Sequence, residues 1–181
     1  LAVYFILANM PPGCRSQVHT IQLALLCESS YVEEYGLDKV LEPLIQELTE
    51  LDHNGLNILH EGNEINLKCS FLMMLGDNLA AHQVGGFTES FNARRPCRFC
   101  LVRKDKMASG ENGCLRQRRK HDEQVKLVKQ NGMFARIYGV NGESALAGVS
   151  LFHPVETLPS DVLHDVLEGV AKDIIERTVL H

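Results

Sequence analysis

The sequence predicts a mixed α/β fold, because strand-like and helix-like patterns alternate along the chain. Val3–Asn9 is an apolar run of strand length, broken by Pro11 and Pro12. Tyr31–Asp52 carries apolar residues at helical spacing on one face and acidic residues opposite, which predicts an amphipathic helix. Ile65–Leu75 is largely apolar, which is typical of a central strand covered on both faces.

The remaining elements follow from shorter signals. Val18–Cys27 fits either a buried strand or a short helix, because periodicity does not separate the two for a short apolar run. Leu56–Leu59 predicts a strand that a turn at residues 61–63 joins to Ile65–Leu75. Asn78–His82 is expected to begin a helix that ends at two glycines.

The second half of the chain alternates between helical and irregular segments. Leu115–Gln130 predicts a polar, basic helix, and the glycines and prolines of residues 133–159 indicate irregular structure. Ser160 or Asp161 is expected to cap a final helix that continues to the end of the sequence. We therefore expect a partial core over residues 1–93, a basic insertion over 94–159, and the start of a C-terminal core helix over 160–181.

Composition narrows the class of protein. The chain has 181 residues, of which 45% are hydrophobic, enough for a globular domain with a core. No apolar run approaches the roughly 18 residues of a membrane-spanning helix. Six scattered cysteines are too few for a disulfide scaffold, which favours a reducing, intracellular compartment. The first residue is Leu and a strand begins at once, so we expect an internal fragment of a longer protein.

Charge is strongly segregated. The net charge is −5, yet residues 94–120 hold 10 Lys and Arg against 2 Asp and Glu. Such an excess indicates either a surface that contacts the phosphates of DNA or a solvated loop. The candidate DNA-binding residues are Arg94, Arg95, Arg98, Arg103, Lys104, Arg116, Arg118, Arg119 and Lys120.

Three groups of residues are candidates for metal chemistry. Asp77 follows the apolar run and Gly76, a place where a carboxylate could hold Mg²⁺, although on sequence alone an ordinary turn or a helix cap explains it better. Cys97 and Cys100 form half of a zinc site, and His121, Cys114, His153 and His164 could complete it. A redox-active cysteine pair is the alternative. Asp161 and His164 lie one helical turn apart, where His164 could bind metal and Asp161 could orient it.

Four stretches together resemble transposases of the CACTA type and related cut-and-paste DNA transposons, a branch of the DDE transposases. These stretches are VYFILANMPPGCRS at 3–16, GDNLAAHQVGGFTESF at 76–91, RPCRFC at 95–100 and LPSDVLHDVLEGV at 158–170. The resemblance implies an incomplete RNase H-like mixed sheet with flanking helices and an insertion that contains the Cys-x-x-Cys pair. It also implies a nuclear protein that binds DNA and, at full length, an oligomer.

The resemblance assigns roles to single residues. Asp77 matches the second of three acids that hold two Mg²⁺ ions for DNA strand cleavage and transfer. Cys97 and Cys100 match a structural Zn²⁺ pair, and Asp161 with His164 matches an acid-x-x-His element before the third acid. The first and third acids are expected outside residues 1–181, so this chain alone should not cut DNA. The alternative is a domesticated, non-catalytic relative that binds DNA or protein.

Overall fold

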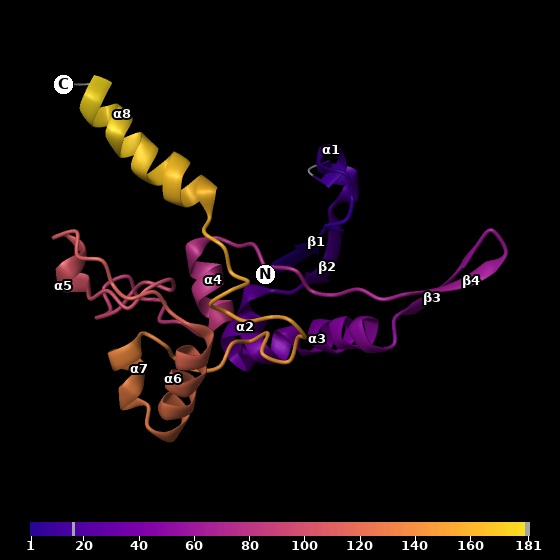
Figure 1. Ribbon diagram of the computed structural model, residues 1–181, viewed down its shortest axis with the longest axis horizontal. Helices are drawn as coiled ribbons and strands as arrows, with labels where there is room; N and C mark the ends of the chain where they lie inside the picture. Colours follow the sequence, from indigo (N-terminus) through magenta and orange to yellow (C-terminus); the bar gives the residue numbers. More distant parts are fainter. Residues whose placement is uncertain (16, 180–181) are drawn as a thin grey trace. The chain divides into compact units, whose positions relative to one another are not determined.

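The protein is mixed α/β, as the sequence predicts. The computed structural model describes residues 1–15 and 17–179 (Figure 1). The chain divides into two compact units: Leu1–Leu72 with Gly148–Leu151, and Met73–Ala147 with Phe152–His181. One short segment, residues 148–151, returns to the first unit from the second half of the chain.

The first unit begins with a two-stranded antiparallel sheet. β1 (Ala2–Phe5) pairs with β2 (Gln22–Leu26), with a register irregularity between Val3 and Tyr4. Between the strands lie α1 (Pro12–Arg15) and the short 3₁₀ helix η1 (Val18–Thr20). The ambiguous segment 18–27 thus holds both a helical turn and a strand, and most of β2 is exposed rather than buried.

The long helix expected over 31–52 is two helices. α2 (Ser29–Tyr35) ends at Gly36, and α3 (Leu37–His53) starts directly after it. Gly36 has a φ of 87°, and an added Cβ there would lie 2.7 Å from Oδ1 of Asp38. A residue with a side chain is strained in that conformation, so the glycine divides the helix.

A tight hairpin follows. β3 (Leu56–His60) pairs antiparallel with β4 (Asn63–Leu67), and the two-residue connection has positive φ at Glu61 and Gly62. The expected central strand Ile65–Leu75 is therefore wrong beyond residue 67: residues 68–76 have no regular structure. β3 starts only at Leu56, so the hairpin offers β4 no partner past Leu67.

The second unit carries the remaining helices. They are α4 (Asn78–Gly85), α5 (Lys104–Met107), α6 (Arg118–Gln130), α7 (Met133–Tyr138), the π-helix η2 (Leu163–Val170) and α8 (Ala171–Val179). α4 ends as expected at Gly86, which is left-handed with a φ of 69°. The apolar side chains of η2 and α8, such as Leu167 and Ile174, are exposed.

The core of this unit forms around Phe87 and Val140, which are fully buried and bridge antiparallel to each other. Thr88 N donates to the carbonyl of Gly139 at 3.1 Å, so α4 and α7 are joined just beyond their ends. Other core residues are Ala81, Val84, Val128, Leu146, Phe152 and Leu158. No helix within residues 1–15 and 17–179 is both long and apolar enough to cross a membrane.

Candidate functional site

Asp77 caps a helix. Its Oδ1 accepts a hydrogen bond from Ala80 N at 2.7 Å, which satisfies one of the free N–H groups at the start of α4. The residue is exposed, and the segment that leads to it has no strand. Asp77 therefore lies at the start of a helix. The strand end that was expected just before Asp77 is absent, and the residues before it have no regular structure.

Asp161 and His164 form a pair at the start of η2. One carboxylate oxygen of Asp161 accepts from the backbone N–H of Leu163 at 3.0 Å and of His164 at 3.3 Å. The other oxygen bonds Nδ1 of the His164 ring. This hydrogen bond raises the pKa of His164 above its ordinary value, and the same contact lowers the pKa of Asp161. The expected cap at Asp161 is confirmed.

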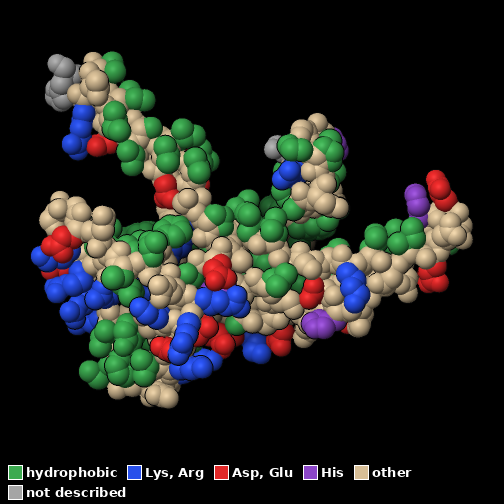
Figure 2. Space-filling model, in the orientation of Figure 1, with side chains coloured by type: hydrophobic (Ala, Val, Ile, Leu, Met, Phe, Trp, Pro, Cys, Tyr) green, Lys and Arg blue, Asp and Glu red, His purple; other side chains and the backbone are tan. Residues whose placement is uncertain are grey.

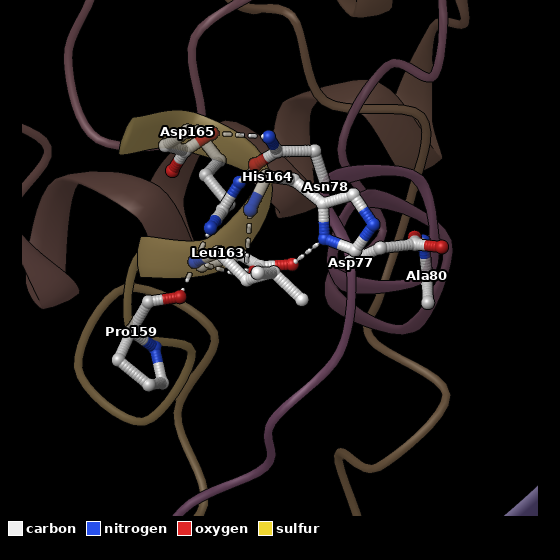
Figure 3. A network of polar contacts seen from close by, with 9 residues as sticks. Asp77, Asn78, Ala80, Pro159, Leu163, His164 and Asp165 are labelled. Carbon is white, nitrogen blue, oxygen red and sulfur yellow. Dashed lines mark hydrogen bonds and ion pairs between the residues drawn. The ribbon is translucent and has the colours of Figure 1, made fainter. Parts of the chain in front are cut away.

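Asp77 and this pair face one place, although they come from distant parts of the sequence. In Figure 3 the side chains of Asp77 and His164 lie side by side, and the negative charge of Asp77 contributes to the raised pKa of His164. Asn78, the first residue of α4, donates from its side chain to Oδ1 of Asp165. We call Asp77, Asp161 and His164 the acid–histidine cluster.

Arg98 contacts Asn78, the neighbour of Asp77 in the sequence, and is only 4% exposed. Its Nη1 donates to Oδ1 of Asn78, and its Nη2 donates to the carbonyl of Pro159 at 2.9 Å. Burial lowers the pKa of Arg98, and the charge of Asp165 acts in the opposite direction. Arg98 is therefore a structural cation in this unit, and its guanidinium is not presented to a DNA backbone as the charge pattern predicted.

Cys97 and Cys100 lie together in a turn built around a sulfur atom. Sγ of Cys97 accepts from the backbone N–H of Phe99 at 3.3 Å and of Cys100 at 3.4 Å. Both thiols are partly exposed, and burial is the main cause of a raised pKa at Cys100. N–H groups directed at sulfur stabilise a thiolate, the form that binds metal. The Cys-x-x-Cys spacing itself is the one at which two thiolates can share a zinc ion.

Two of the four candidates for completing the zinc site, His121 and His164, make other contacts. His121 is 2% exposed in α6, with its ring 5.2 Å from Phe87 and 5.6 Å from His153 between ring centroids. Burial, followed by the charge of Arg116, lowers the pKa of His121 to about 4. His164 is bonded to Asp161 instead. Among the residues that the structure describes, no three His, Cys, Asp or Glu side chains come together in a geometry that could hold a metal.

Arg116 is a second buried cation that the sequence placed on the DNA-binding surface. It is 6% exposed, and its Nη2 donates to the carbonyls of Cys97 at 3.1 Å and Tyr138 at 2.8 Å. Its guanidinium carbon lies 5.2 Å from the Phe87 ring centroid, a cation–π contact. Burial lowers the pKa of Arg116 to about 10. The sequence contains no signal that separates this arginine from the exposed Arg118 and Arg119 beside it.

The other basic residues remain on the surface. Arg95 is half-buried and donates to the carbonyl of Ile137 at 2.9 Å. Figure 2 shows Lys and Arg side chains gathered over the region of α5 and α6. Arg103, Arg118 and Arg119 form exposed ion pairs, which hold them only weakly. The exposed basic surface consists of Arg94, Arg103, Lys104, Arg118, Arg119 and Lys120.

Comparison with known proteins provides no assignment. No protein-family model, curated protein or solved structure matches this chain. What the protein does must therefore be inferred from its own motifs and geometry.

Proposed function

We propose that this chain is a DNA-binding part of the catalytic region of a CACTA-type or related cut-and-paste transposase, or of a nuclear protein derived from one. The exposed basic surface over α5 and α6 carries this proposal. Its six side chains are exposed, and the ion pairs that engage three of them are exchangeable for phosphate contacts. The RNase H-like fold belongs to the proposal through the motif resemblance alone.

The chemistry of such a surface is neutralisation of phosphates. Each Lys or Arg that contacts a phosphate releases condensed counterions, so affinity falls as salt rises. Six contacts correspond to a slope of about −5 in the logarithm of affinity against the logarithm of salt concentration. Sequence selectivity is not expected, because phosphate contacts orient a protein on DNA without reading its bases.

Fluorescence anisotropy with a labelled DNA duplex tests the proposal. The triple variant Arg118→Glu, Arg119→Glu, Lys120→Glu should lose most of the affinity and flatten the salt dependence. Reversal of three exposed lysines outside the surface, Lys39, Lys68 and Lys172, produces the same change in net charge and serves as the matched control. Equal losses of DNA affinity in both triple variants would show that the exposed basic surface has no specific role in binding. A wild-type chain that does not bind DNA would refute the proposed function.

Zinc belongs to the same proposal. Cys97 and Cys100 would supply two thiolate ligands, and the ion would cross-link the turn that contains them as a structural element. We expect about one Zn²⁺ per chain by elemental analysis, lost in Cys97→Ser and retained in Cys69→Ser, which changes an exposed cysteine of the other unit. A folded wild-type protein that is free of zinc after growth in zinc-supplemented medium would contradict it.

A contribution to catalysis is the second candidate, favoured by the acid–histidine cluster. The Asp77 carboxylate is exposed, and the Asp161–His164 pair lies beside it. In a complete enzyme Asp77 would hold Mg²⁺ together with acids from outside this chain, and the metal would activate water or a DNA 3′-hydroxyl. The chain alone should not nick supercoiled plasmid with Mg²⁺; nicking that disappears in Asp77→Asn would show that it carries a complete site.

A further inference from the structure

Two segments that are far apart in the sequence build the acid–histidine cluster. Asp77 comes from the start of α4, whereas Asp161 and His164 come from the start of η2. The Asp161–His164 contact spans only three residues and can form within its own segment. The position of Asp77 beside that pair depends on what joins the two segments.

Arg98 makes the central connection. Its guanidinium donates to Asn78 on the α4 side and to the carbonyl of Pro159 on the η2 side. Asn78 completes the connection by donating to Asp165. Outside this network, the described residues of the two segments share one backbone hydrogen bond, from Met74 N to the carbonyl of Thr157 at 3.0 Å. The network is thus the main polar link between the segments.

Among the described residues, the rest of the Arg98 guanidinium makes no further hydrogen bond. Its Nε is buried without a hydrogen bond among the described residues, which costs free energy. Its guanidinium carbon lies 4.4 Å from the ring centroid of Phe99, and the cysteine turn fixes its backbone. A buried arginine whose side-chain hydrogen bonds both lie at one junction, at the cost of an unpaired Nε donor, indicates that the junction is its role.

We propose that Arg98 is a positioning residue that holds Asp77 beside the Asp161–His164 pair by joining the start of α4 to residues 159–165. The chemical use of the cluster rests on the proposed function, but the joining role does not. Arg98 acts through Asn78 and Pro159 and is itself buried. Lysine should not replace it, because one ammonium group cannot reproduce the planar fork that spans an amide oxygen and a carbonyl.

The side-chain amide of Asn78 provides a local readout in the metal-free, DNA-free protein. Because this group donates to Asp165, we expect NMR cross-peaks between its Nδ2 protons and the β-protons of Asp165. Arg98→Met should abolish these cross-peaks. Arg98→Lys should also abolish them, while the methyl signals of the core residues Val84 and Val140 stay in place and show that the variant is folded. Arg95→Met, a matched change of an arginine that donates to a carbonyl elsewhere, should leave them intact.

The outcomes separate the two proposals. Cross-peaks that persist at full intensity in folded Arg98→Lys overturn the positioning role. If Arg98→Met does not fold, Arg98→Lys decides the result, because it retains the charge and most of the buried chain. Wild-type protein that shows the cross-peaks but does not bind DNA would refute the proposed function and leave the role of Arg98 standing.

Discussion

Replacing His121 by leucine should remove a defined part of the acid sensitivity of this protein. His121 is 2% exposed, its Nδ1 has no hydrogen-bond partner among the described residues, and it lies between Phe87 and His153. The charged imidazolium is unfavourable there because burial removes it from water and the Arg116 cation repels it. The folded protein therefore keeps His121 neutral.

The sign and size follow from linkage. The folded pKa of about 4 lies below the ordinary histidine value of 6.5, so the unfolded chain takes up a proton first as pH falls. Stability is complete above the unfolded pKa and is lost as pH falls toward the folded pKa. The total loss is about 3 kcal/mol, of which about 2 kcal/mol is lost between about pH 7 and pH 5.

Urea unfolding of wild type and His121→Leu near pH 7 and pH 5 measures this difference. The loss of unfolding free energy between the two pH values should be smaller by about 2 kcal/mol in the variant. His60→Leu, which changes an exposed histidine of the other unit, is the control and should keep the wild-type loss. An unchanged pH dependence in His121→Leu would refute the reasoning.

The His121→Leu variant also tests the prediction that His121 is a zinc ligand. Because His121 is a buried core residue, we predict that the His121→Leu variant retains the zinc bound by Cys97 and Cys100. Loss of zinc from a folded variant would instead show that His121 is one of the metal ligands.

Two further predictions concern backbone geometry. Asp77→Ala should lower the unfolding free energy by about 1 kcal/mol through loss of the α4 cap, whereas Asp77→Asn should cost little because asparagine also caps helices. Urea unfolding of both variants separates the effect of the cap from the effect of the negative charge. Equal losses of unfolding free energy in the two variants would contradict the capping role. Gly139→Ala should destabilise by more than about 1 kcal/mol, because its φ is 67° and a Cβ would lie 2.2 Å from the carbonyl oxygen of Arg95. Gly132→Ala, with nothing within 4 Å of its Cβ, is the thermal-melting control, and similar melting temperatures for the two would count against this explanation.

Local structural features could be predicted from the sequence where neighbouring residues decide the structure. The end of α4 at Gly86, the turn before β4 and the cap at Asp161 all depend on residues within a few positions. The sequence did not correctly predict the end of the strand expected to reach Leu75. An apolar run becomes a central strand only if partner strands exist on both sides. The hairpin with β3 supplies a partner only as far as Leu67.

By itself, the sequence determined that this protein is mixed α/β, that its basic charge is concentrated in residues 94–120, and that Cys97 and Cys100 share one turn. These properties depend on composition and on short spacings. The tertiary structure alone decided which cations are buried: Arg98 and Arg116 are enclosed by carbonyls and aromatic rings, while Arg118 and Arg119 remain exposed. Burial depends on segments distant in sequence, so identical side chains a few positions apart acquired opposite roles.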